Sequence, residues 1–263
     1  MAIPSSKSEL IVLKDREWLS NQKHAGRAVS NALKVCAGAI RVRDPLTLLQ
    51  IEELAVEQIE LMDCTPTFLG YRGFPGKICT SVNKTLVHGF PTDYLLRDGD
   101  VVTVDMGATY HGTIADAAYS VVYGEPAEHV SEMLKLCQGA LRAAIKAVKV
   151  GERMGVIGHA IYEHVRSSRY GLITTYGGHG IDTDVLHASP FVPNKSRKNE
   201  GPRIQPGFSI AIEPMLTLGK NTNTKTLPDK WSIVTRDVGC HFEHSITVDE
   251  DGKVHIITEH GMY

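Results

Sequence analysis

The chain has 263 residues, of which 42% are hydrophobic and 22% are charged, a balance that supports a folded core and excludes a largely disordered protein. Its formal net charge of −2 offers no basic excess for a nucleic-acid backbone, so we expect no nucleic-acid site. No apolar run approaches the ~20 residues of a membrane helix, and the first 18 residues lack the apolar stretch of a secretory signal, which predicts a cytoplasmic protein without a membrane span.

In chain order, the hydrophobic pattern predicts a pair of helices, a group of strands, a second pair of helices and a second group of strands. Apolar residues recur at helical spacing in the helices, and short β-branched runs between Gly and Pro mark the strands. The expected helices cover residues 14–39, 46–62, 128–148 and 155–170, with Pro45 at the first turn of the second. The expected strands cover residues 78–82, 85–87, 101–104, 116–123, 172–175, 208–212, 231–234, 245–248 and 254–257.

This order amounts to a coarse duplication, with halves at about residues 14–124 and 125–263 and no linker long enough to separate them. Grouped helices and grouped strands favour an α+β fold, in which helices pack on the outer side of antiparallel sheet. We therefore expect a single domain over residues 1–263.

Acidic residues interrupt the predicted strands. Four carboxylates stand at strand ends or inside apolar runs: Asp105, Asp116, Glu213 and Glu243. A single one of them could be an ordinary surface acid, but an ionised carboxylate beside Val and Ile is costly to bury without a positive partner. No Lys or Arg occurs between Arg97 and Lys135, so a bound metal is the economical counter-charge. His179, expected in a glycine-rich loop, adds an imidazole, and such a set suits Mn, Fe, Co or Zn.

Six motifs occur in a characteristic order: VHGFP at 87–91, VDMG at 104–107, HG at 111–112 followed by Asp116, GHG at 178–180, IEPM at 212–215 and FEH at 242–244. Together they resemble type I methionine aminopeptidase, of the pita-bread superfamily of metallopeptidases. The resemblance implies a pita-bread fold of two pseudo-symmetric halves. It also implies hydrolysis of the first peptide bond, which removes methionine when the second residue is small.

The resemblance implies a centre of two divalent ions (Co, Mn, Fe or Zn), with Asp116 and Glu243 as bridging ligands. The implied metal ligands are Asp105, Asp116, His179, Glu213 and Glu243, and the implied catalytic residues are His88, His187 and Glu213. The implied substrate-binding residues are His88, His187, Tyr71, Phe74, Cys79 and Trp231. The sequence departs from the family pattern in having eight residues, where seven are common, from His179 to His187, and Asp182 where Gly is usual.

Two further histidines lie close to Glu243 in the sequence. We expect strand alternation to place His241 and His244 on the face opposite Glu243, where they would have structural roles.

The alternative enzyme is a prolidase-like or Xaa-Pro aminopeptidase of the same superfamily, because residues 105–108 also resemble that branch, although its members usually carry a large N-terminal domain. A metal-free binding homologue is the non-enzymatic alternative. The expected partners are the N-termini of nascent polypeptides, including at the ribosome, and we expect a monomer.

Overall fold

The computed structural model describes residues 11–262. The expectation about a secretory signal falls partly on residues 1–10, which lie outside the described residues. Among the helices that the structure describes, none combines the length and the apolar character of a membrane span.

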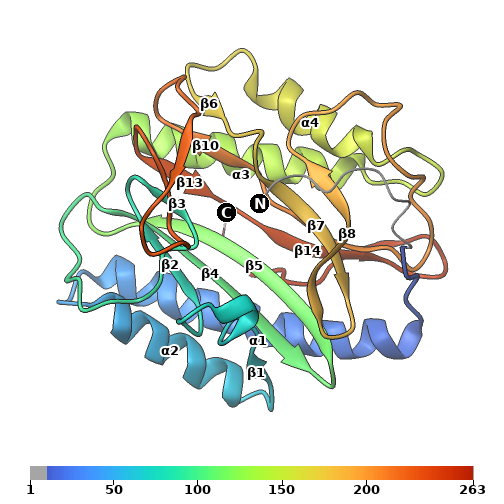
Figure 1. Ribbon diagram of the computed structural model, residues 1–263, viewed down its shortest axis with the longest axis horizontal. Helices are drawn as coiled ribbons and strands as arrows, with labels where there is room; N and C mark the ends of the chain where they lie inside the picture. Colours follow the sequence, from blue (N-terminus) through green and yellow to red (C-terminus); the bar gives the residue numbers. More distant parts are fainter. Residues whose placement is uncertain (1–10, 263) are drawn as a thin grey trace.

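Two pairs of helices flank the strands, one pair on each side (Figure 1). They are α1 (Arg16–Val42), α2 (Leu48–Glu60), α3 (Glu128–Ala147) and α4 (Gly155–Val165). The α1 helix packs against two central strands, and its buried face includes Val29, Leu33 and Cys36, which recur at helical spacing as the sequence predicts. All four expected helices are present, with ends that differ by a few residues.

The second helix begins later than expected. The Thr47 side chain caps the N–H of Gln50, and the Gln50 side chain accepts from the N–H of Thr47. This capping box fixes the first helical residue at Leu48, because it satisfies N–H groups that have no partner inside the helix. Pro45 therefore precedes the helix and does not occupy its first turn, which corrects the prediction.

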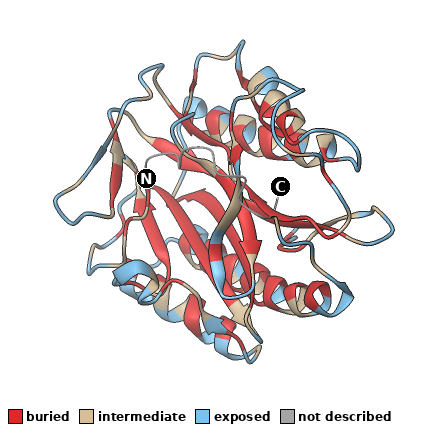
Figure 2. Ribbon diagram, turned by 45° about the vertical axis from the view of Figure 1, so that its right-hand side comes forward, coloured by how far each residue is buried: buried red, intermediate tan, exposed pale blue. Residues whose placement is uncertain are grey.

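The strands form antiparallel sheets in the middle of the molecule (Figure 2). The strands are β1 (Thr65–Pro66), β2 (Cys79–Val82), β3 (Thr85–Val87), β4 (Val101–Tyr110), β5 (Thr113–Val122), β6 (Gly171–Leu172), β7 (Gly177–Asp182), β8 (Val185–Pro193), β9 (Ser209–Ile212), β10 (Met215–Thr217), β11 (Thr224–Thr226), β12 (Ile233–Thr235), β13 (Gly239–His241), β14 (His244–Val248) and β15 (Val254–Ile256); a short 3-10 helix, η1, covers Tyr71–Gly73. One sheet has the order β1-β4-β2 with β5 paired to β4, a second has the order β15-β14-β9-β7-β8, and two smaller sheets have the orders β13-β10-β6 and β11-β12-β3.

The β4–β5 hairpin explains the spacing of the first two carboxylates. Its two-residue turn, His111-Gly112, has positive φ at both positions, as a tight hairpin turn requires. In the resulting register Asp105 pairs with Ala118, while Asp116 pairs with Gly107. Asp105 and Asp116 are therefore diagonal neighbours on one face of the sheet, roughly 7–8 Å apart between Cα atoms.

Strand β14 joins the two halves of the chain beside this hairpin. The Glu243 N–H donates to the carbonyl of Ala118 at 2.9 Å. The Ser245 hydroxyl donates to the carbonyl of Asp116 at 2.7 Å and accepts from the Asp116 N–H at 2.8 Å. These bonds bring an acid from the C-terminal half next to Asp116, although the two are more than 120 residues apart.

The sequence prediction missed the β7–β8 hairpin, because its glycines and polar residues indicate a loop. The backbone at these glycines approaches its neighbours too closely for a side chain. A Cβ at Gly178 would lie 2.0 Å from the carbonyl oxygen of Ala211, and one at Gly180 would lie 2.0 Å from that of Ser189. His179 thus lies in a strand held against β9, not in the expected loop.

Candidate metal centre

The structure brings together the five residues that the sequence marks as metal ligands. Asp116 and Glu243 are almost fully buried, with 3% and 2% of their surface exposed. His179 is the common neighbour: its Nε2 lies 3.7 Å from Asp116 Oδ2, 3.8 Å from Glu213 Oε1 and 4.0 Å from Glu243 Oε1. Asp105 belongs to a second group with Glu243, whose ligand atoms lie within 4.8 Å of one another.

The two glutamates face each other because of the pairing of β9 with β14. His244 pairs with Ile212 in this ladder, so Glu213 and Glu243 occupy the next opposed position beyond it. Asn194 donates its amide N–H to the carbonyl of Glu213 at 3.1 Å and holds the chain where β9 ends. The sequence carries no motif around Asn194 that would predict this role.

The tautomer of His179 suits a metal ligand. Its Nδ1 donates to the carbonyl oxygen of Gly180 at 3.0 Å. Nδ1 is therefore the donor in this bond, and Nε2 lies on the side of the Asp116 and Glu213 carboxylates, where it could bind a cation.

Within residues 11–262, these buried carboxylates have no Lys or Arg partner to balance their charge. Burial raises the pKa of Asp105 to about 7, an effect that His241 partly offsets, and burial raises the pKa of Glu213 to about 7. Burial and the neighbouring acids raise the pKa values of Asp116 and Glu243 well above their usual range. Among the described residues, Asp105 Oδ1, Asp116 Oδ1 and Glu243 Oε1 are buried without a hydrogen-bond partner. Converging acceptor oxygens without donors fit divalent cations, so the residues present fit the predicted metals.

The prediction for His241 was wrong. Residues 241 and 243 are two apart, so alternation places both on the same side, and His241 Nε2 lies 3.4 Å from Glu213 Oε2 and 3.7 Å from Glu243 Oε2. His244 does point away from the cluster, since its Nδ1 bonds to the hydroxyl of Thr258 at 3.0 Å.

Both histidines expected to contact substrate lie near this cluster. His88 has a φ of 59°, a strained conformation for a residue other than glycine, and desolvation, followed by the charge on His241, lowers its pKa to about 4. The ring of His187 lies 4.5 Å from that of His179, measured between centroids, and its Nδ1 bonds to the Tyr71 hydroxyl at 3.0 Å. His187 lies in β8, in a hairpin with two register shifts, so the extra residue before it does not remove it from His179.

Asp182, where the sequence departs from the family pattern, stabilises the same hairpin. Its carboxylate pairs with the ammonium of Lys14, whose side chain is 4% exposed. Beside it the Trp18 indole N–H donates to the Thr183 hydroxyl at 3.1 Å. The beginning of α1 is thus tied to the turn of the hairpin whose second strand carries His187.

The four predicted pocket residues belong to one apolar cluster. Phe74 and Cys79 are buried in it, and Tyr71 and Trp231 pack against it. The rings of Phe74 and Trp231 meet edge to face at 5.2 Å between centroids. Cys79 pairs with Asp105 across β2 and β4, so the apolar cluster adjoins the carboxylates directly.

Burial, and after it the charge of Asp105, raises the pKa of Cys79 well above its ordinary value. The thiol is therefore neutral and serves as an apolar wall.

The comparisons with known proteins agree with this geometry. The model of metallopeptidase family M24 matches residues 20–250. The chain therefore belongs to metallopeptidase family M24. Within that family it is 35% identical over 245 residues to methionine aminopeptidase 1 of Bacillus subtilis (strain 168), an alignment that covers 92% of this chain and 97% of that protein.

Solved structures give the same result. The crystal structure of methionine aminopeptidase from Thermotoga maritima is similar with a TM-score of 0.90 and 34% identity, covering 95% of this chain and 100% of that chain. The prolidase from Pyrococcus furiosus shares the fold at a TM-score of 0.71 and 17% identity, and this chain covers 65% of it. The predicted family and the predicted α+β pita-bread fold are confirmed.

Proposed function

We propose that this protein is a metal-dependent methionine aminopeptidase, which hydrolyses the first peptide bond of a polypeptide that begins with methionine when the second residue is small. The observation that carries the proposal is the convergence of Asp105 and Asp116 on Glu243, each with a buried oxygen that lacks a donor in the described part of the chain. His179 lies beside Asp116 and Glu243. The similarity to methionine aminopeptidases over most of the chain supports the same reaction.

The proposed cofactor is a pair of divalent ions, drawn from Co, Mn, Fe and Zn. Asp105, Asp116, His179, Glu213 and Glu243 would hold them, with Asp116 and Glu243 shared between the two. When bound, such ions polarise the scissile carbonyl and activate a water molecule near neutral pH.

The chain's own residues would bind and orient the peptide at this centre. The apolar cluster next to Asp105 suits an unbranched thioether side chain, and a charged first residue would lose its hydration there. His187, whose Nδ1 bonds to the Tyr71 hydroxyl, would donate to the carbonyl oxygen as negative charge develops there. His88 would orient the amide of the same bond, and Glu213 would act beside them as a metal ligand.

The reaction is tested with Met-Ala-Ser and Ala-Pro peptides after dialysis against a chelator and reloading with Mn, Co or Zn. We expect Met-Ala-Ser to be cleaved only by the metal-loaded protein, because without cations the carboxylates cannot assist attack by water. Cleavage of Ala-Pro alone would replace this proposal with a prolidase-type activity. Full activity in a verified metal-free preparation would contradict the metal-dependent mechanism, and absence of both metal binding and activity would indicate a binding homologue.

We further propose that the enzyme works as a cytoplasmic monomer on the N-termini of nascent polypeptides, including at the ribosome. Residues 1–263 would form a single metallopeptidase domain, with halves at about residues 14–124 and 125–263.

A further inference from the structure

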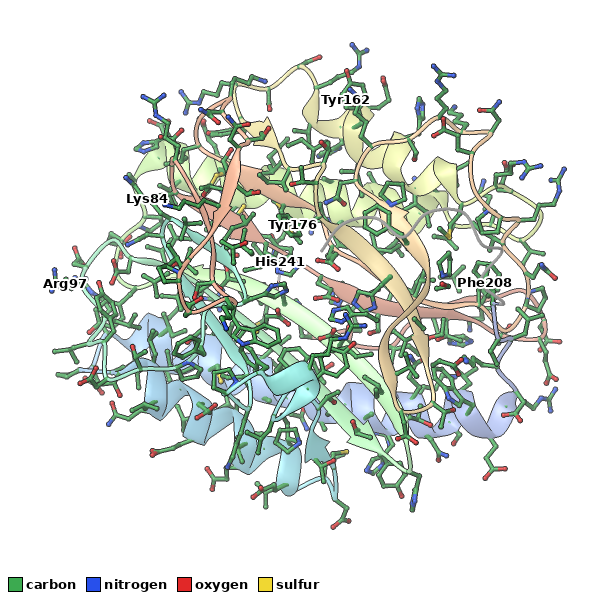
Figure 3. All side chains as sticks on the ribbon, viewed as in Figure 1. Lys84, Arg97, Tyr162, Tyr176, Phe208 and His241 are labelled. Atoms are coloured by element: carbon green, nitrogen blue, oxygen red, sulfur yellow. The ribbon has the colours of Figure 1, made fainter. Side chains whose placement is uncertain are left out.

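His241 is a buried imidazole whose ring nitrogens have no hydrogen-bond partner. Only 2% of the surface of His241 is exposed, and neither Nδ1 nor Nε2 forms a hydrogen bond with any of the described residues. A buried polar side chain without a partner is costly, so such a group usually indicates a ligand that is bound in the working protein. In Figure 3 His241 lies near the centre of the molecule, among the strands.

The ring approaches the two glutamates at different oxygen atoms from those that His179 approaches. His179 Nε2 approaches the Oε1 atoms of Glu213 and Glu243, at 3.8 Å and 4.0 Å. His241 Nε2 approaches the Oε2 atoms of the same residues, at 3.4 Å and 3.7 Å. Each glutamate therefore presents one oxygen to each imidazole.

The potential ligand atoms form two triads that share Glu243. One triad is Asp116, His179 and Glu243, and the other is Asp105, His241 and Glu243. In both triads the ligand atoms lie within 4.8 Å of one another. Each consists of one aspartate, one imidazole and the shared glutamate, so the two halves of the site have the same chemical composition.

The distances fit an ion between these atoms better than a hydrogen bond. Ligands about 2.1 Å from an ion, at angles between 90° and tetrahedral, are separated by roughly 3–3.5 Å. The 3.4 Å between His241 Nε2 and Glu213 Oε2 falls in this range, and the 3.7 Å to Glu243 Oε2 lies just above it. The contact with Glu213 lies beyond the usual hydrogen-bond range and does not satisfy the ring nitrogen.

We propose that His241 is a sixth protein ligand of the metal centre and that it binds the ion on the Asp105 side through Nε2. This inference rests on the proposed metal-dependent function. It gives each of the two ions a nitrogen ligand, whereas the five residues expected from the sequence leave the Asp105 side with oxygen ligands only. Because imidazole suits Co, Ni and Zn better than Mn or Mg, the Asp105 side should prefer the former ions.

The test compares the wild type with His241→Gln, which keeps a polar side chain of similar reach but removes the strong nitrogen ligand. His244→Gln is the matched control, because His244 is the next buried imidazole and points away from the cluster. Circular dichroism and thermal melting of the metal-free proteins establish that each variant is folded.

The first measurement is proton NMR of the protein loaded with two equivalents of Co²⁺. We expect two exchangeable imidazole N–H signals shifted by the paramagnetic ions, from His179 and His241, and one such signal in His241→Gln. A single shifted signal in the wild type, unchanged in His241→Gln, would overturn the proposal. An imidazole that only positions its neighbours is not bonded to Co²⁺, so its N–H signal would not show the large paramagnetic shift of a ligand.

The second measurement is calorimetric titration with Co²⁺ and with Mn²⁺. His241→Gln should weaken one of the two Co²⁺ binding events by more than about tenfold and should affect Mn²⁺ less, while His244→Gln retains both affinities. If His241→Gln is active and binds two ions with unchanged affinities, His241 is not a metal ligand, while the proposed function stands. Failure of the wild type to bind ions or to cleave Met-Ala-Ser would instead refute the proposed function.

Discussion

The shared carboxylates are the residues on which the site depends most. Glu243 belongs to both triads, and Asp116 lies on the same sheet face as Asp105 and faces His179. Removing their negative charge leaves the surrounding space unchanged but removes the anionic oxygens that two cations would share.

We expect Asp116→Asn and Glu243→Gln to abolish hydrolysis of Met-Ala-Ser. Each should also weaken metal binding by more than ~10–100-fold, the loss in affinity that follows removal of a residue that only hydrogen-bonds to a metal ligand. Activity assays with calorimetric metal titration measure both effects. The exposed Asp251→Asn serves as the matched charge control and should behave as wild type. Near-normal activity in either site variant would show that the ions are not shared through these residues.

The two histidines outside the ligand set should affect rate without affecting metal content. His88→Ala and His187→Ala are each expected to keep two ions per chain and to lower kcat on the order of 10²–10³-fold, the value of one preorganised donor. Elemental analysis beside steady-state kinetics provides the measurement. A His187→Ala enzyme with near-normal kcat would mean that a different donor stabilises the developing charge.

At the scale of elements, the proposed methionine pocket lies where the end of η1, β2 and the segment before β12 meet. The Phe74 and Trp231 rings come from segments more than 150 residues apart and contact each other beside Cys79. Such a pocket would recognise the first side chain through apolar contact, which is worth about 1.5–3 kcal/mol for a fully buried side chain.

We expect Phe74→Ala to lower kcat/KM for Met-Ala-Ser roughly 10–100-fold, mainly through KM, because it removes contact with the methionine side chain but no group at the metals. Leu69→Ala, an exposed change in the same loop, is the control. With the wild type, Met-Ala and Met-Gly peptides should be cleaved and Met-Leu peptides barely. A Phe74→Ala enzyme that keeps its KM for Met-Ala-Ser would place the methionine side chain elsewhere.

At the scale of the whole molecule, the cluster of acids opposes folding when metals are absent. In the folded state burial raises the pKa of Asp105 from 3.8, and that of Glu213 from 4.5, to about 7. The folded protein therefore retains protons that the unfolded chain releases, and the contribution of these groups to stability is greatest below about pH 4 and is lost as the pH rises to about 7.

We expect the metal-free wild type to lose stability relative to a metal-free Asp105→Asn, Glu213→Gln double variant between about pH 4 and pH 7. The loss should be a few kcal/mol, since each pKa unit corresponds to about 1.4 kcal/mol. Urea unfolding of both proteins across this range measures the difference in their free energies of unfolding. The contributions of the histidines that both proteins contain cancel in this difference. Saturation with Mn²⁺ should remove the loss in the wild type, and a difference independent of pH would show that burial does not raise the pKa values of these acids.

Much of this architecture follows from local pattern. Helical spacing of small apolar residues predicts α1, and runs of Val and Ile predict β4 and β5, because burial of one face imposes a period on the sequence. The positions of Asp105 and Asp116 are also set locally, since a two-residue turn and strict pairing leave a single register for them.

The parts that could not be predicted depend on contacts between distant segments. The β7–β8 hairpin has the glycines of a loop, and only the neighbouring backbones of β9 and β8 explain why those glycines lie in a strand. The sequence prediction for the side on which His241 lies is wrong, although the two-residue spacing alone places it with Glu243. What spacing could not supply is its distance to Glu213, because that distance depends on how β13, β9 and β14 pack, and packing is a property of the assembled chain.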